Sequence, residues 1–291
     1  MDIRPVLMGL AFAAMWSSAF TSASIIVEYA PPLTALALRF LVSGTLGVII
    51  ALVLGQNAYL TRQQWIGVVV FGVCQNALYL GLNFVAMQTV AASLAAIIAS
   101  TMPLLVALVG WAFLGQKIRA LGVAGLIAGV VGVTLIMGAR ITGGVDVYGL
   151  VLCIIGVVSL TVATLAVLGA ASGGNVLMIV GLQMLVGSAV LWVPALAWES
   201  FDITWSWQLI AAFGYTTIVP GLLATWVWFI LVGRIGAVKA STFHFLNPFL
   251  GVAIAATLLG EPIGILDVVG VVIIAGGILA VQLSKRSTAQ S

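Results

Sequence analysis

The sequence predicts an all-α integral membrane protein with ten transmembrane helices in a 5+5 inverted-topology repeat. Three observations predict this fold class. Apolar residues make up 63% of the 291 residues and charged residues only 6%, whereas a soluble domain carries roughly 25% charged residues. The apolar residues form runs of about 20, the length of a helix that crosses a bilayer. The second half of the chain repeats the first, and the charges of matching loops are reversed.

Short loops rich in glycine, proline and amide side chains separate the apolar runs, so we expect no soluble domain. Typical loops are Pro31-Pro32, Gly55-Gln56-Asn57 and Glu261-Pro262. The ten transmembrane helices are expected at residues 5–27, 32–54, 64–85, 90–113, 120–138, 147–169, 175–197, 207–230, 238–259 and 265–283.

The repeat is clearest from Leu78 to Met137, which matches a segment about 145 positions later. A loop with Lys117 and Arg119 in the first copy becomes a loop with Glu261 and Asp267 in the second. Because basic loops stay cytoplasmic, two like-folded halves with reversed loop charges insert in opposite orientations. We expect a first repeat at residues 1–141 and an inverted repeat at residues 142–291, with the site between them as in inverted-repeat transporters. The coinciding residues are Pro103 with Pro248, Gly115 with Gly260, Gly125 with Gly270, and Gly132 with Gly277.

The basic residues also predict the orientation of the chain. With the N-terminus inside, the cytoplasmic side collects Arg4, Arg62, Lys117, Arg119, Arg234, Lys239, Lys285 and Arg286, and the outside keeps only Arg140. Six acidic residues fall outside: Glu28, Asp146, Glu199, Asp202, Glu261 and Asp267. We therefore expect a multi-pass protein of the inner membrane with both termini in the cytoplasm.

Polar and aromatic side chains at mid-membrane depth are candidate substrate-binding residues. The third helix carries Asn76, Tyr79 and Asn83 at spacings of three and four, so they share a face. Such a stripe is costly in hydrocarbon unless it faces protein or water, which favours cavity lining. The alternative is hydrogen bonding between helices, worth about 0.6 kcal/mol per contact. In the first helix, the indole N–H of Trp16 needs an acceptor at mid-membrane, and plain packing is the alternative for its ring.

Prolines within the fourth, eighth and ninth helices are candidate hinges. Pro103 and Pro248 occupy matching places in the two repeats, and each frees the carbonyl four residues earlier. Paired kinks beside a central site suit alternating access, and a fixed packed bend is the alternative. Pro220 adds a third, unpaired kink. Ser100 and Asn247 lie beside the paired prolines and belong to the candidate site.

Two ionisable side chains lie inside predicted helices. His244, the only histidine, has three candidate roles: hydrogen bonding to substrate, proton carriage, or packing. Arg39 lies about two turns below the outer surface, where an arginine is expensive unless it is paired or reaches the interface. We expect Arg39 to be a structural charge that reaches toward Glu28 or helix-end carbonyls. Capture of a substrate carboxylate is the alternative.

Several motifs resemble a known family. The "WSSAF" of the first helix, the "PPLTALALRF" that opens the second, and the "GQ" and "GE" that end the fourth and ninth resemble the EamA branch of the drug/metabolite transporter (DMT) superfamily. The resemblance covers nearly the whole chain. It implies a central cavity lined by helices 1, 3, 4, 6, 8 and 9, with helices 5 and 10 as scaffold. Within this branch, the length and the lack of an embedded carboxylate most resemble amino-acid and metabolite exporters of the YddG type.

The absence of several functional motifs from the sequence limits the classes of function that it can have. Cation-exporting multidrug relatives use a carboxylate in the first helix, whereas all seven acids here are terminal or in loops, which favours a neutral or zwitterionic substrate. No Walker A loop is present, so we expect neither direct use of ATP nor an ATP-binding subunit. The basic residues lie in short loops and form no nucleic-acid face. Cys74 and Cys153 lack metal-ligand spacing. We expect no metal, no cofactor and no enzymatic activity.

These inferences predict a transporter that exports small aromatic or neutral amino acids and related metabolites across the lipid bilayer by alternating access. His244 is the only candidate for proton carriage at mid-membrane, which favours facilitated diffusion or exchange without obligatory proton coupling. The alternatives are a drug or nucleobase exporter of the same fold and, from a different class, a passive channel or scramblase. The expected substrate-binding residues are Trp16, Asn76, Tyr79, Asn83, Ser100, His244 and Asn247.

Overall fold

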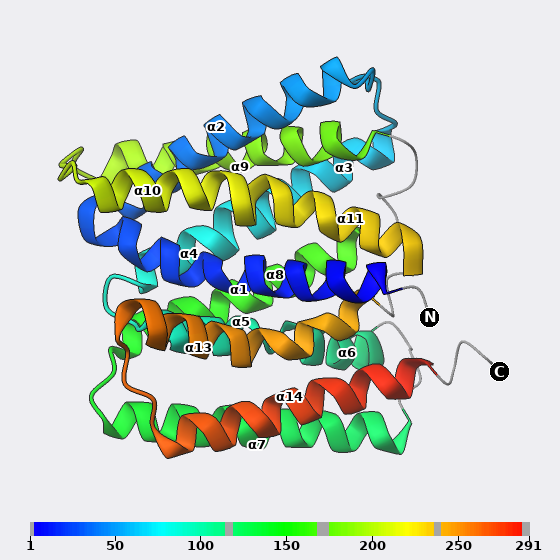
Figure 1. Ribbon diagram of the computed structural model, residues 1–291, viewed down its shortest axis with the longest axis vertical. Coiled ribbons are helices and arrows are strands. Elements are labelled where there is room, and N and C mark those ends of the chain that lie inside the picture. The colour runs from blue at the N-terminus through cyan, green and yellow to red at the C-terminus, as the bar shows by residue number, and fades with distance from the viewer. Residues whose placement is uncertain (1–2, 114–118, 168–174, 236–239, 287–291) are drawn as a thin grey trace. The chain divides into compact units, whose positions relative to one another are not determined.

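The structure, a computed structural model, describes residues 3–113, 119–167, 175–235 and 240–286. All regular elements in these residues are helices (Figure 1), which confirms the all-α class. Within this part of the chain, nine helices are long and apolar enough to cross a membrane. Lys117 and Lys239, which contribute to the predicted orientation, lie outside the described residues.

Six predicted spans are single helices with bounds close to the expected ones. Their large apolar side chains point outward as well as inward: Val130 is 66% exposed and Val193 is 71% exposed. An apolar outer surface of this kind suits lipid and not water. The six helices are α1 (Arg4–Tyr29), α2 (Pro32–Val53), α7 (Ala120–Thr142), α8 (Val147–Val167), α9 (Val176–Trp198) and α14 (Ile265–Arg286).

Three predicted spans are interrupted helices. The third is α3 (Arg62–Phe71), the π-helical η1 (Gly72–Tyr79) and α4 (Leu80–Ala86). The eighth is α10 (Trp207–Thr216), the π-helical η2 (Thr217–Leu223) and α11 (Ala224–Ile235). The fourth is α5 (Ala92–Ala99) and α6 (Met102–Phe113). The two π-helical segments lie about 145 positions apart, so the irregularity itself recurs in both halves.

The ninth predicted span, 238–259, differs from the others. Residues 236–239 lie outside the described part, after which the chain forms the 3-10 helix η3 (Ser241–Leu246) and then α13 (Asn247–Leu259). Pro248 lies in the first turn of α13, where its missing N–H is not needed, so it starts a new helix. The described part of this span is the short apolar helix Phe243–Leu259, and the ten-helix count stays a prediction.

The helices form two compact units. Unit 1 comprises residues 1–21, 89–150 and 227–291, and unit 2 comprises residues 22–88 and 151–226. Each unit therefore takes helices from both predicted repeats, 1–141 and 142–291. In unit 1, α7 packs along α14 and α5 packs on α13, whereas in unit 2 α2 packs along α9 (Figure 1).

Glycines hold α7 and α14 of unit 1 close together. A Cβ atom on Gly125 would lie 2.6 Å from the carbonyl oxygen of Gly277, and one on Gly132 would lie 2.9 Å from that of Gly270. The repeat matches Gly125 with Gly270 and Gly132 with Gly277. Gly125 therefore contacts the repeat counterpart of Gly132, and Gly132 contacts the repeat counterpart of Gly125. Reciprocal contacts of this kind are the pattern that a two-fold axis produces.

The pair α2 and α9 of unit 2 shows the same reciprocity. A Cβ atom on Gly44 or on Gly181 would lie 2.9 Å from the carbonyl oxygen of the other glycine. About two helical turns away, the hydroxyl of Ser188 donates to the carbonyl of Ala37 at 2.8 Å. With an offset of about 144 positions, Gly44 corresponds to Ser188 and Ala37 to Gly181. The two contacts are therefore the two halves of one symmetric pattern.

Side chains cap both ends of this helix pair. The carboxylate of Glu199, just after α9, accepts hydrogen bonds from the N–H groups of Leu33 and Thr34 and from the Thr34 hydroxyl, each at 2.7 Å. At the opposite end, just after α2, the side-chain oxygen of Gln56 accepts a hydrogen bond from the N–H of Met178 at 3.1 Å. We call these the carboxylate cap and the amide cap of unit 2.

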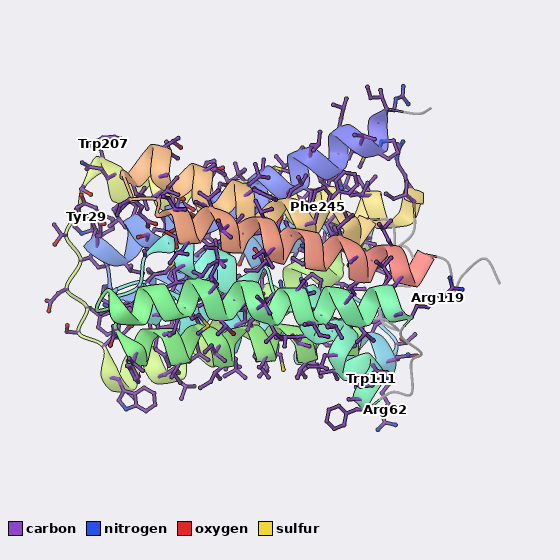
Figure 2. The ribbon with its side chains drawn as sticks, turned by 90° about the horizontal axis from the view of Figure 1, so that it is seen from below. Tyr29, Arg62, Trp111, Arg119, Trp207 and Phe245 are labelled. Carbon is purple, nitrogen blue, oxygen red and sulfur yellow. The ribbon has the colours of Figure 1, made fainter. Side chains whose placement is uncertain are left out.

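The two ends of unit 2 can be followed in Figure 2. Tyr29 and Trp207 lie at the end with the carboxylate cap, and Arg62 lies at the opposite end. Trp207 is 75% exposed, as suits an aromatic side chain at a membrane interface.

Unit 1 has a carboxylate cap of its own. Glu261, in the loop between α13 and α14, accepts hydrogen bonds from the N–H groups of Ala92 and Ser93 at 2.8 and 3.1 Å. These two residues open α5, so the carboxylate ties the end of one kinked span to the start of the other. A negative group at a helix N-terminus also stabilises the helix dipole.

Asp146 caps the next helix of this end of unit 1. Its carboxylate accepts from the hydroxyl of Thr89 at 2.7 Å and from the N–H of Gly149, in the first turn of α8, at 3.0 Å. The hydrogen bond from Thr89, followed by that from Gly149, lowers the pKa of Asp146 below its ordinary value. Both bonds favour the ionised form.

Candidate functional site

An aromatic cluster in unit 1 surrounds the single histidine. Phe12 and Trp16 of α1 have ring centroids 5.8 Å apart, and Phe12 lies 4.7 Å from Trp228 of α11. The ring of His244, in η3, meets Phe12 at 5.4 Å and Trp228 at 5.1 Å, both edge to face. Phe12 and His244 are buried, and the two tryptophans are half-buried. We call these four residues the ring cluster.

The ring cluster has one polar edge, formed by His244 and Asn247. The amide nitrogen of Asn247 lies 3.0 Å from Nδ1 of His244. Because an amide nitrogen only donates, Nδ1 accepts, and the neutral imidazole carries its proton on Nε2. The amide oxygen of Asn247 is buried and has no hydrogen-bond partner among the described residues. A buried acceptor left in this state costs about 1–3 kcal/mol, so the site favours a ligand that donates a hydrogen bond.

The start of α1 approaches the same region of unit 1. The hydroxyl of Ser17 lies 3.4 Å from the carbonyl oxygen of Asn247. Gly9 faces the ring of Phe243 with no room for a side chain between them. The absence of a Cβ atom at Gly9 therefore lets α1, the helix that carries Phe12 and Trp16, come close to η3.

Ser100 lies at the break between α5 and α6. Its hydroxyl donates to the carbonyl of Ala96 at 2.6 Å. Ala96 also marks where α5 crosses α13, since a Cβ atom on Gly251 would lie 2.6 Å from that of Ala96. The cap from Glu261 shows that the two helices are antiparallel, so Ser100 and Asn247 both lie one turn beyond this crossing, on the same side of it.

The three predicted hinges all lie at irregular backbone. Pro103 follows the break at Ser100 and opens α6, and Pro248 follows η3 and opens α13. Pro220 lies inside the π-helical η2. All three side chains are buried. Whether these positions move during transport stays a prediction.

The polar stripe of the third span lies in unit 2 and is fully packed. Asn76 donates from its side-chain nitrogen to the carbonyl of Gln183 in α9 at 3.0 Å. Asn83 donates in the same way to the carbonyl of Tyr79 at 2.8 Å. Each of the three stripe residues is at most 2% exposed. The contact of Asn76 is a hydrogen bond between two helices, which is the alternative to cavity lining for this stripe. Substrate binding by the three stripe residues stays a prediction.

Small residues let this stripe approach its neighbours. Gly187 of α9 faces the Cβ of Asn76 with no room for a side chain of its own, and a Cβ atom on Gly156 of α8 would lie 2.8 Å from the side-chain nitrogen of Asn83. Both amides therefore contact the backbone of a neighbouring helix.

Sequence reasoning did not identify Phe12 and Trp228 as parts of the site. Phe12 could have been found, because it precedes Trp16 by four residues and so shares its helix face. Trp228 lies more than 200 residues away in sequence, and no pattern in the chain links it to the first helix. Among the described residues, no group of three or more His, Cys, Asp or Glu side chains is placed to hold a metal ion.

Comparison with known proteins gives a consistent match along the chain. The model of the EamA-like transporter family matches twice, at residues 3–138 and 147–283. The chain is 27% identical over 285 residues to the uncharacterized transporter YvbV of Bacillus subtilis, which covers 98% of this chain and 93% of that protein. It is 26% identical over 289 residues to the uncharacterized inner membrane transporter YedA of Escherichia coli K12, with 96% and 91% covered.

A protein of known crystal structure has the same fold. The two superpose with a TM-score of 0.72 over 99% of each chain, at 22% sequence identity. At this identity the likeness concerns the fold alone.

Proposed function

Because the chain belongs to the EamA-like transporter family and is a multi-pass membrane transporter, we propose that it exports small aromatic or neutral amino acids and related metabolites. The proposal places it in the inner membrane, with ten spans and both termini in the cytoplasm. Its mechanism is alternating access by facilitated diffusion or exchange.

The ring cluster is the observation that carries this proposal. Three aromatic rings offer a large apolar surface with a preference for planar partners. The neighbouring Nε2–H of His244 and the unpaired oxygen of Asn247 offer one donor and one acceptor. An aromatic amino acid presents a ring together with an ammonium group that can donate to the unpaired oxygen of Asn247. The remaining predicted residues, Ser100 in unit 1 and the stripe of unit 2, are proposed as further contacts along the path.

The absence of a counter-charge at His244 supports transport without obligatory proton coupling. Among the described residues, His244 contacts two aromatic rings and an amide but no carboxylate. A charged imidazolium in this apolar surrounding has no partner to stabilise it. The ring therefore stays neutral through the cycle and acts as a hydrogen-bonding group.

Paired irregularities in the two halves support alternating access. The breaks at Pro103 and Pro248 and the π-helical segments η1 and η2 each recur about 145 positions apart. The family model likewise matches once within each predicted repeat. Discontinuous helices at matching positions are the usual elements of such a mechanism.

Counterflow in proteoliposomes tests the proposal. Vesicles preloaded with unlabelled phenylalanine or leucine should accumulate the labelled form transiently, which a channel does not do. Trp16→Leu and Trp228→Leu should each lower the rate at least tenfold, because they remove a ring from the cluster. Trp226→Leu is the matched control, since Trp226 lies on the same helix as Trp228 but is 49% exposed. Counterflow of adenine or a cationic dye without any amino acid would establish the drug or nucleobase alternative instead.

An imposed pH gradient tests the coupling. With no substrate gradient, it should fail to concentrate phenylalanine in wild-type vesicles. Concentration that disappears with a protonophore and in His244→Ala would show that the histidine carries protons.

Cysteine labelling tests the orientation. Tyr59 is 91% exposed and Trp205 is 74% exposed, at opposite ends of unit 2. On a background without Cys74 and Cys153, Trp205→Cys should react with an impermeant reagent in intact cells and Tyr59→Cys should not. Reaction of both from one side would contradict the topology.

A further inference from the structure

Arg39 is a buried charge in the interior of unit 2. It lies seven residues after Pro32, about 10 Å along α2 at 1.5 Å per residue, and is only 4% exposed. Its guanidinium group does not reach Glu28, the partner expected from the sequence: no ion pair or hydrogen bond joins this group to any described residue, and its Nε atom is buried without a partner.

The acids of unit 2 leave Arg39 without a counter-charge. Its described residues contain three acids, and two of them, Glu28 and Asp202, are exposed. The third, Glu199, is held by the first turn of α2 in the carboxylate cap. That turn lies five residues before Arg39, about 7.5 Å along the helix axis. The described residues of unit 2 therefore offer Arg39 no free anionic group.

The contacts that remain do not balance the cost of burying this charge. The guanidinium carbon lies 5.1 Å from the centre of the Phe40 ring, and such a cation–π contact contributes about 0.5–2 kcal/mol. Removing an ion from water costs several kcal/mol even after the protein relaxes. Arginine does not escape this cost by losing its proton. An anion that binds the guanidinium group would supply the missing stabilisation.

The segment that faces the guanidinium group presents no side chain to it at the nearest position. This segment is η2, where Gly221 has no side chain, and a Cβ atom there would lie 3.6 Å from Nη2 of Arg39. The hydroxyls of Thr216 and Thr217 turn away, since they donate to the carbonyls of Ala212 and Phe213. The backbone of η2 therefore faces Nη2 without a competing polar side chain.

We propose that Arg39 binds the carboxylate group of the transported solute. The planar guanidinium fork matches a carboxylate through two parallel hydrogen bonds, and the unpartnered Nε belongs to that fork. Arg62, the other described arginine of unit 2, is exposed at the end of the unit. A single positive charge balances a monocarboxylate and not a doubly charged phosphate. Arg39 thus restricts the solutes to monocarboxylates, including zwitterionic amino acids.

Binding of a carboxylate probe to the purified full-length protein tests this inference without transport. Benzoate should bind in calorimetry and raise the unfolding temperature, whereas benzamide, which has the same ring and no charge, should bind at least tenfold more weakly. Arg39→Gln should lose this preference, and Arg62→Gln should keep it. Failure of the wild-type protein to prefer benzoate over benzamide overturns the inference, even if Arg39→Gln does not fold. Phosphate or chloride binding as tightly as benzoate would show a general anion site and also overturn it.

The inference rests on the proposed function, because it names the transported solute as the ligand of Arg39. Transport assays distinguish a failure of this inference from a failure of the proposed function. Wild-type vesicles should move phenylalanine at least tenfold faster than phenylalaninamide, and Arg39→Gln should reduce this ratio to about one by slowing phenylalanine. Equal slowing of both compounds would leave the exporter intact and refute the role of Arg39. Benzoate binding that depends on Arg39, without transport of any amino acid, would refute the exporter and retain the carboxylate site.

Discussion

The two caps of unit 2 occupy equivalent places but use different chemistry. Thr34 and Met178, whose N–H groups they bind, lie 144 positions apart, which is the repeat offset of these helices. The carboxylate cap of Glu199 makes three hydrogen bonds of 2.7 Å, and the amide cap of Gln56 makes one of 3.1 Å. Hydrogen bonds to an ionised acceptor are shorter and about twice as strong as neutral ones.

This difference indicates that the acidic residues of the loops have a structural role, separate from the role of the basic residues in membrane topology. The basic residues are those that set topology, since acidic residues count for little in that rule. The structure shows what acids do at one end of each unit: Glu199, Glu261 and Asp146 each cap the start of a helix. In unit 2 the inverted repeat therefore keeps a capping position in both copies, filled by the charged Glu199 in one and by the neutral Gln56 in the other.

Removing the carboxylate cap of unit 2 should have the largest effect. Glu199→Ala leaves two N–H groups and a hydroxyl without their acceptor, and we expect it to lower the free energy of unfolding by about 3 kcal/mol. Glu199→Gln, which converts it to the chemistry of the amide cap, should cost about half as much. Denaturant titration in detergent micelles measures both. The exposed Asp202→Ala should change stability by less than about 0.5 kcal/mol. An equal effect of Asp202→Ala would remove the distinction between capping and surface acids.

The cap of Glu261 should contribute less, because it makes two hydrogen bonds and the longer is 3.1 Å. We expect Glu261→Ala to lower the free energy of unfolding by about 2 kcal/mol. Hydrogen exchange should rise first at the amides of Ala92 and Ser93, which lose their acceptor. Unchanged protection at these two amides would mean that the carboxylate does not hold the start of α5 in solution.

Placing a carboxylate at the amide cap should sharpen the comparison. Gln56→Glu puts a negative charge at the start of α9, and we expect it to raise the free energy of unfolding by about 0.3–1 kcal/mol. Gln56→Ala should lower it by about 1 kcal/mol. The same micelle titration measures both. If Gln56→Glu proves no better than Gln56→Ala, the charge is not what distinguishes the two caps.

Replacement of Asp146 should have the smallest effect on stability, and this effect should depend on pH. Its folded pKa is lowered by the hydrogen bonds from Thr89 and Gly149. Its contribution to stability is therefore present above the unfolded pKa of about 3.9 and is lost as the pH falls through the lower folded value. The difference in unfolding free energy between wild type and Asp146→Asn should stay constant from pH 7 to pH 5 and shrink below pH 4. A difference that stays constant throughout would show that the carboxylate is not preferentially ionised in the fold.

Hydrophobicity and proline predicted most of the fold from sequence. The bounds of α2 and α9 agree with the predicted spans within one or two residues, since apolar run length is set by the bilayer. The breaks near Pro103 and Pro248 were predicted from the missing N–H. The π-helical η1 was not, because it contains no proline and its side chains follow the pattern of an ordinary helix.

The site was predicted less completely. Polar and aromatic residues at mid-membrane depth are rare, which singles out Trp16, His244 and Asn247. All three belong to unit 1, and their binding of substrate stays a prediction. Phe12 and Trp228 are more than 200 residues apart in the sequence, and Thr34 and Glu199 of the carboxylate cap are 165 residues apart. Contacts of such long sequence separation leave no local pattern, so they required the structure.

The composition of the two units has a consequence for how the chain is made. The small-residue face of α2 at Gly44 is inserted into the membrane well over 100 residues before its partner α9 is synthesised. Unit 2 acquires its last described helix only near residue 226, and unit 1 is incomplete until α14 has been synthesised. During translation the glycine surface of α2 therefore stays without its partner until α9 has been made, and the first turn of α5 stays uncapped until the loop that carries Glu261 has been made.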